Sequence, residues 1–131
     1  MNVMSVDIGF VSATDALVAF YRDVFDLEPL EPRVFPDGTV HRLGLGSGAL
    51  KVMVPARTPA ESPLTARFWD RAGLRYVTMW LDDLDAVIER WTNRGGTIAL
   101  GPLTIRSGVR TALLVDPDGN TVEAMHDSGQ G

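Results

Sequence analysis

The feature of this sequence that most restricts its fold is an order of elements that occurs twice. In the first half, alternating apolar residues predict a strand at 4–10, and apolar residues at helical spacing predict a helix at 15–24. Three more strands are predicted at 28–35, 40–45 and 49–54. A strand, a helix and three strands therefore form the first module.

The same order returns in the second half. A strand is predicted at 76–81, and a helix then begins at Asp82 or Asp83 and ends at Gly95-Gly96. Four short candidate strands follow at 97–100, 104–105, 111–115 and 121–125, in the place of the three strands of the first half. The helices superpose at an offset of 70 residues and the last strands at 72, which places Lys51 on Glu123.

These patterns predict a single α+β domain over residues 1–131. It consists of two tandem βαβββ modules, at about 1–55 and 74–127, with a connector at 56–73 and a flexible tail at 128–131.

Composition excludes several kinds of site and partner. Without cysteine the chain has no disulfide, zinc–cysteine site, iron–sulfur cluster or thiol nucleophile. Twelve basic and seventeen acidic residues give a net charge of −5, which argues against nucleic acid as a partner. No apolar run approaches the roughly 18 residues of a membrane span, and no basic-then-apolar leader opens the sequence. We therefore expect a cytoplasmic protein that does not bind membranes.

Three stretches resemble the vicinal oxygen chelate superfamily of glyoxalases, bleomycin resistance proteins and extradiol dioxygenases. Residues 20–25, Phe-Tyr-Arg-Asp-Val-Phe, look like the superfamily's helix ending, although Phe25-Asp26 stands where Leu-Gly is usual. Residues 81–86 look like its second strand-to-helix junction, and residues 115–123 like its final turn and strand. The resemblance covers nearly the whole chain. It implies that the two modules form a curved-sheet cup with helices on the outside, and that the protein is a homodimer.

The resemblance also indicates where a metal would be held. Metal-dependent members carry a His early in each module's first strand and a Glu in each module's last strand. Those places are Val6, Lys51, Tyr76 and Glu123 here, and only Glu123 is a typical ligand. The resemblance therefore implies neither a catalytic metal nor a cofactor. An alignment shifted by one would offer Asp7, but the alternation of the strand places Asp7 on its polar side, opposite Val6.

A further hypothesis concerns the residues that take the place of the metal ion. Lys51 and Glu123 would face the cup from equivalent strands, so an ion pair between them, with the Tyr76 hydroxyl beside it, is the sharpest prediction. Two alternatives stay open. Either Lys51 reaches the strand edge while Glu123 takes a backbone or arginine partner, or Lys51 is buried, unpaired and able to attack a carbonyl.

The histidines give weaker signals. His41 shares one strand face with leucines, so it is either a base lining the cup or a partly buried strand histidine. His126 lies three positions beyond Glu123, on the opposite strand face, so the two are not a metal pair. The catalytic candidates are Glu123, Lys51, Tyr76 and His41.

An aromatic wall indicates the kind of ligand. Tyr76, Thr78 and Trp80 share one strand face, which suits a ligand wall, although aromatic residues at this spacing also build cores. Phe68 and Trp69 in the connector form either a lid or a subunit contact. The predicted ligand-binding residues are Val6, Ile8, Phe10, Lys51, Met53, Tyr76, Thr78, Trp80, Glu123 and Met125.

Three functions follow. The first is a metal-free protein of the bleomycin-resistance kind that binds a planar or cationic small molecule. The second is a metal-independent enzyme that transfers protons on a small carbonyl or cyclic substrate. The third is a metal-dependent lyase, epimerase or dioxygenase whose ligands lie elsewhere. The fold alone does not choose among them.

Overall fold

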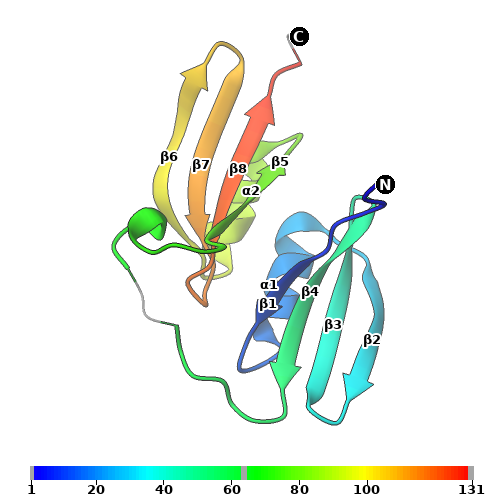
Figure 1. The fold of residues 1–131 in the computed structure, drawn as a ribbon. Coiled ribbons are helices and arrows are strands. Elements are labelled where there is room, and N and C mark those ends of the chain that lie inside the picture. Colours follow the sequence, from blue (N-terminus) through cyan, green and yellow to red (C-terminus); the bar gives the residue numbers. More distant parts are fainter. Residues whose placement is uncertain (1, 63–64, 130–131) are drawn as a thin grey trace. The chain divides into compact units, whose positions relative to one another are not determined.

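The chain divides into two compact units, Met1–Ser62 and Pro63–Gly131, in a computed structural model that describes residues 2–62 and 65–129. Each unit contains one α-helix and one four-stranded mixed sheet (Figure 1). The predicted α+β class with two βαβββ modules is confirmed. The unit boundary falls inside the predicted connector, and residues 130–131 of the predicted tail lie outside the described residues.

The first unit has the predicted order of elements. These are β1 (Ile8–Val11), α1 (Ala16–Phe25), β2 (Pro29–Phe35), β3 (Gly38–Leu45) and β4 (Gly48–Pro55). The sheet order is β1-β4-β3-β2, with β1 parallel to β4 and the other pairs antiparallel. The last strand of the module therefore lies at the centre of the sheet, beside the first.

Helix α1 covers one face of this sheet because its apolar side chains pack against apolar side chains of the strands. The Phe10 ring of β1 stacks on Tyr21 of the helix with centroids 5.3 Å apart, and Tyr21 is fully buried. The helix ends at Asp26, which has φ 53° and donates its backbone N–H to the Arg22 carbonyl. Asp26 thus adopts a left-handed conformation, which aspartate tolerates better than most residues other than glycine.

The second unit repeats the topology. Its elements are a short 3₁₀ helix η1 (Phe68–Asp70), β5 (Tyr76–Trp80), α2 (Leu84–Asn93), β6 (Thr97–Arg106), β7 (Val109–Val115) and β8 (Thr121–Asp127). The sheet order is β5-β8-β7-β6, with β5 parallel to β8. The two short strands predicted at 97–100 and 104–105 are one strand, whose pairing with β7 shifts register around Gly101-Pro102.

Helix α2 begins and packs as its sequence predicts. The Asp83 carboxylate caps it by accepting the Ala86 backbone N–H at 3.0 Å. Trp91 is fully buried, and its indole Nε1 donates to the Thr97 and Val115 carbonyls, each at 3.1 Å. The indole therefore holds the helix to both β6 and β7. Within the described residues, neither helix is long and apolar enough to cross a membrane.

Candidate functional site

The face of the second sheet that lies away from α2 carries half of the ten predicted ligand-binding residues. The opposite face is identified by Arg110 of β7, whose guanidinium forms two hydrogen bonds of 3.1 Å with the Asp85 carboxylate of α2. We call the face away from α2 the aromatic face. The strand register arranges it in three rows: Trp80, Met125, Thr111 and Leu103; Thr78, Glu123, Leu113 and Leu100; Tyr76, Thr121, Val115 and Thr97.

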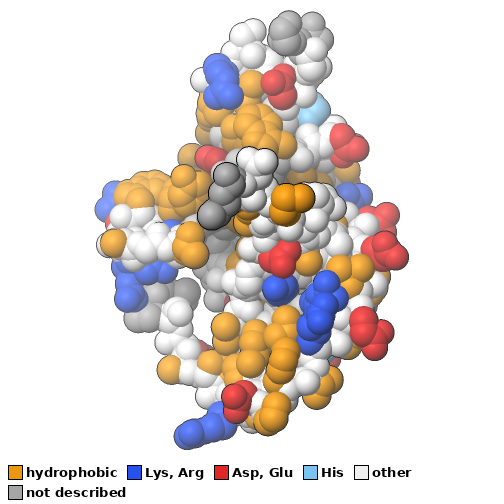
Figure 2. Space-filling view, turned by 45° about the vertical axis from the view of Figure 1, so that its right-hand side comes forward, with side chains coloured by type: hydrophobic (Ala, Val, Ile, Leu, Met, Phe, Trp, Pro, Cys, Tyr) orange, Lys and Arg blue, Asp and Glu red, His pale blue; other side chains and the backbone are white. Residues whose placement is uncertain are grey.

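At the β5 edge of the aromatic face two exposed rings flank a polar pair. Tyr76 and Trp80 are 52% and 58% exposed, whereas Met79 between them in sequence is buried against the helix side. The predicted division of β5 into a mixed aromatic face and a packing face is confirmed. Exposed hydrophobic side chains are common on this molecule, where they alternate with acidic and basic ones (Figure 2).

Glu123 is held by its neighbour across the sheet. The Thr78 hydroxyl donates to Glu123 Oε1 at 2.7 Å, and the two residues are register partners on β5 and β8. A carboxylate that accepts a hydroxyl hydrogen bond keeps a defined orientation. The site therefore presents an oriented carboxylate on β8, in the row between those of two accessible aromatic rings on β5.

The corresponding face of the first sheet, away from α1, is charged. Lys51 Nζ lies 3.1 Å from Asp7 Oδ2, and both side chains are about two-fifths exposed. Asp7 Oδ1 also accepts the Ala49 backbone N–H at 2.9 Å. The Lys51 hydrogen bond, then the Ala49 N–H, and the positive charges of Lys51 and Arg42 lower the pKa of Asp7 below its ordinary value of 3.8. We call Asp7, Lys51 and Arg42 the charged face.

The Lys51–Asp7 ion pair tests one of the predictions for the partner and burial of Lys51. The hypothesis of a buried, unpaired Lys51 is wrong, because the side chain is partly exposed and has a carboxylate partner within its own unit. The pair of Lys51 with Glu123 would join the two units and stays a prediction. Within the second unit, the hydrogen-bond partner of Glu123 is Thr78.

The predicted equivalence of Val6 with Tyr76 is wrong by one residue. In the first unit Gly9 pairs with Lys51, and in the second Thr78 pairs with Glu123. Because Lys51 and Glu123 are equivalent, Gly9 is equivalent to Thr78. Tyr76 lies two residues before Thr78, so its equivalent lies two residues before Gly9 and is Asp7. Asp7 therefore lies on the same face as Lys51, not on the opposite side that the alternation of the first strand predicts.

The same one-residue correction also changes the sheet face on which other predicted ligand-binding residues lie. Phe10 packs on Tyr21 of α1, and Ile8 pairs with the buried Leu50, so both lie on the helix side of their sheet. Their predicted place on the ligand wall is therefore wrong. Met53 pairs with Val11 and does share the charged face with Lys51.

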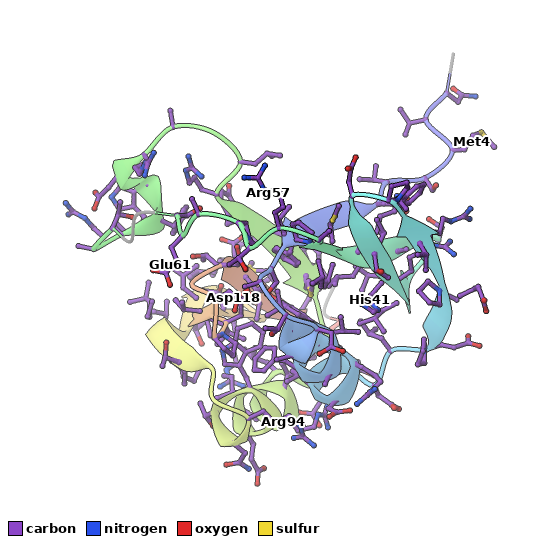
Figure 3. The ribbon with its side chains drawn as sticks, turned by 90° about the horizontal axis from the view of Figure 1, so that it is seen from below. Met4, His41, Arg57, Glu61, Arg94 and Asp118 are labelled. Atoms are coloured by element: carbon purple, nitrogen blue, oxygen red, sulfur yellow. The ribbon has the colours of Figure 1, made fainter. Side chains whose placement is uncertain are left out.

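The two histidines also lie on the helix sides of their sheets. His41 pairs with the buried Val52 and is partly exposed, and Figure 3 shows it on the side of β3 where α1 lies. The prediction of a partly buried strand histidine is confirmed. The Nδ1 atom of His126 lies 2.8 Å from the Leu81 carbonyl, on the face opposite Glu123 as predicted.

The residues at the superfamily's metal positions do not fit a metal ion. With the corrected register they are Asp7, Lys51, Tyr76 and Glu123, and the ammonium of Lys51 already occupies the carboxylate of Asp7. A tyrosine phenol is not among the usual metal ligands, and the Tyr76 ring packs on Phe68 with centroids 4.9 Å apart. Among residues 2–62 and 65–129, no group of three His, Asp or Glu side chains is placed to bind a metal.

Comparison with known proteins assigns the fold. The family model described as Glyoxalase/Bleomycin resistance protein/Dioxygenase superfamily matches residues 9–124. A glyoxalase family protein from Bacillus cereus superposes with a TM-score of 0.83 at 12% identity, covering 98% of this chain and 97% of its own. No curated protein matches the sequence.

Two further solved structures carry names that describe an activity. The fosfomycin resistance protein FosX from Mesorhizobium loti has a TM-score of 0.67 and 17% identity, over 99% of this chain and 94% of its own. A glyoxalase I mutant from Zea mays has a TM-score of 0.71 and 21% identity, over 91% of this chain and 43% of its own. At these identities the likeness establishes a shared fold.

Proposed function

This chain belongs to the Glyoxalase/Bleomycin resistance protein/Dioxygenase superfamily, and on that premise we propose that it binds a planar organic cation on the aromatic face, without a catalytic metal. One observation carries the proposal. The Glu123 carboxylate, oriented by Thr78, lies in the row between the exposed rings of Tyr76 and Trp80.

This arrangement offers both components that such a ligand needs. The two rings supply apolar contact and an electron-rich surface that attracts a cation. The carboxylate supplies a charge-assisted hydrogen bond to the cationic group. The charged face of the first unit offers less to a cation, because Asp7 is already paired with Lys51.

The comparisons support a small molecule as the ligand. The superfamily's name includes bleomycin resistance, and FosX is a fosfomycin resistance protein. The cytoplasmic location and the homodimer expected from the sequence are part of the proposal. Sedimentation equilibrium of the purified chain tests the dimer, and a monomer at all concentrations would contradict it.

Matched probes test the proposal directly. Benzamidinium is a planar cation, and benzamide has nearly the same shape without the charge. We expect benzamidinium to bind and to raise the melting temperature, whereas benzamide does neither. Glu123→Gln should weaken benzamidinium binding about tenfold in isothermal titration calorimetry, the loss typical of a charge-assisted hydrogen bond.

Two results would count against this function. Equal binding of benzamide and benzamidinium would show that the charge is not recognised, and an unchanged affinity in Glu123→Gln would place the ligand elsewhere. If a planar cation were bound and then released as a chemically altered product, with Glu123→Gln abolishing turnover, the metal-independent enzyme would be the correct function.

A further inference from the structure

One buried polar atom on the aromatic face has no hydrogen-bond partner. Thr111 of β7 is 7% exposed, and its Oγ1 is the one buried side-chain nitrogen or oxygen, among the residues that the structure describes, without a partner. Buried hydroxyls are normally hydrogen-bonded, because losing water without a replacement is unfavourable. Valine has nearly the same shape and would avoid this penalty.

The register places this hydroxyl next to the proposed cation site. Thr111 lies in the row of Trp80 and Met125, and Glu123 lies in the adjacent row on the neighbouring strand. Thr111 and Glu123 are therefore diagonal neighbours on one face, with Cβ atoms roughly 7 Å apart in such a pair. This separation is comparable to the span of a benzene ring with a substituent at each end.

We infer that the Thr111 hydroxyl is a hydrogen-bonding position for the ligand. The ligand is then an aromatic cation that carries a hydroxyl or amino group on the ring edge opposite its charge. This inference rests on the proposed function and specifies the chemistry of its ligand. A threonine hydroxyl both donates and accepts, so either group satisfies it.

Access to the hydroxyl depends on the side chain beside it. Met125 pairs with Thr111 and is 5% exposed. Methionine is unbranched and has three rotatable side-chain bonds, so it can change rotamer more readily than a β-branched residue. A ligand seated against Trp80 and Glu123 would displace the Met125 side chain and bring its substituent to Thr111.

The test compares 4-hydroxybenzamidinium with benzamidinium in three variants. In the wild type we expect the hydroxylated probe to bind about fivefold more tightly, the effect of one added hydrogen bond. Thr111→Val should abolish this preference for the hydroxylated probe, whereas Thr111→Ser should retain it. Thr104→Val is the matched control, because Thr104 pairs with Arg110 on the helix side of the same sheet.

A measurement without ligand completes the test. Thr111→Val should raise the melting temperature of the unliganded protein by about 2–5 °C, since it removes the unpartnered hydroxyl. A lower melting temperature would mean that a trapped water already satisfies Thr111, and would overturn the inference. Equal affinity of both probes for the wild type would also overturn it, while leaving the proposed function intact. Failure of both probes to bind would overturn the proposed function itself.

Discussion

The two units have one topology and one register but opposite chemistry on the faces turned away from their helices. Lys51 and Glu123 occupy the same position on equivalent central strands, and their neighbours on the first strands are Gly9 and Thr78. Thr78 holds Glu123 by a hydrogen bond. Gly9 has no side chain to do the same, and Lys51 pairs instead with Asp7. The backbone therefore fixes where a side chain projects, while its neighbour on the first strand decides its partner.

The helix sides differ as well. In the first unit Tyr21 is held by ring stacking on Phe10 and Phe25. In the second unit Trp91 is held by two hydrogen bonds to strand carbonyls. Stacking tolerates small displacements, whereas the indole must stay in line with both carbonyls. In the second unit, one side chain thus connects the helix to two strands of its sheet.

The largest expected effect concerns this side chain. Trp91→Ala should lower the free energy of unfolding by about 3–5 kcal/mol, because it leaves a large cavity in the core of the second unit. Urea unfolding followed by circular dichroism measures the change. Trp69→Ala is the control, because Trp69 is 58% exposed and should change the free energy by no more than about 0.5 kcal/mol. Similar losses in the two variants would contradict the packing described here.

The next effect tests whether the aromatic face is special. Trp80 and Val11 are equivalent residues that are 58% and 61% exposed. Trp80→Ala should weaken benzamidinium binding about tenfold, as expected when a ring that contacts a cation is removed. Val11→Ala should leave the affinity unchanged. Calorimetric titration of the pair measures the difference, and equal losses would show that the first unit contributes as much as the second.

A smaller effect concerns the stability of the protein at low pH. The pKa values of Asp7 and Asp85 are both lowered from 3.8, first by the side-chain hydrogen bonds of Lys51 and Arg110 respectively. A carboxylate whose pKa is lower in the folded state stabilises the protein above its unfolded pKa. That stability is lost as the pH falls through the folded value.

Asp7→Asn and Asp85→Asn should therefore melt below the wild type at pH 7, and each difference should shrink as the pH falls below the ordinary carboxyl pKa of 3.8 and through the lowered folded-state pKa. Both pairs are exposed, so the differences at pH 7 will be small. Differential scanning calorimetry at a series of pH values measures them. A difference that grew as the pH fell would reverse the sign of the linkage and refute the assignment.

Local patterns in the sequence predicted the order of elements and the two faces of β5. They failed at the first strand because alternation defines two faces without saying which one the helix covers. That choice is made by the parallel pairing of β1 with β4, which aligns Gly9 with Lys51. Gly9 and Lys51 are 42 residues apart in the chain, so their pairing cannot be recognised in a local sequence pattern of about seven residues. Asp7 was therefore assigned to the wrong face.

Thr111 shows a different limit. A polar residue beginning the run Thr-Ala-Leu-Leu-Val was visible in the sequence, but threonine is common in strands and usually finds a partner. Only the placement of every neighbouring donor and acceptor shows that its hydroxyl has none. Metal positions were easier to assess, since the residue types at Lys51 and Tyr76 already disagree with a metal-binding site.

The smallest expected effect concerns the charged face. Lys51 is the only lysine in the chain, and its ammonium lies against the Asp7 carboxylate. Lys51→Met should change benzamidinium affinity less than about twofold, since the ligand is proposed to bind the second unit and exposed ion pairs contribute little. Benzaldehyde with borohydride, followed by mass spectrometry, should label Lys51 no faster than the amine of a free lysine peptide. If Lys51 were labelled rapidly, and if Lys51→Met abolished turnover of a small carbonyl substrate that the wild type converts, the charged face would instead be the site of a covalent reaction.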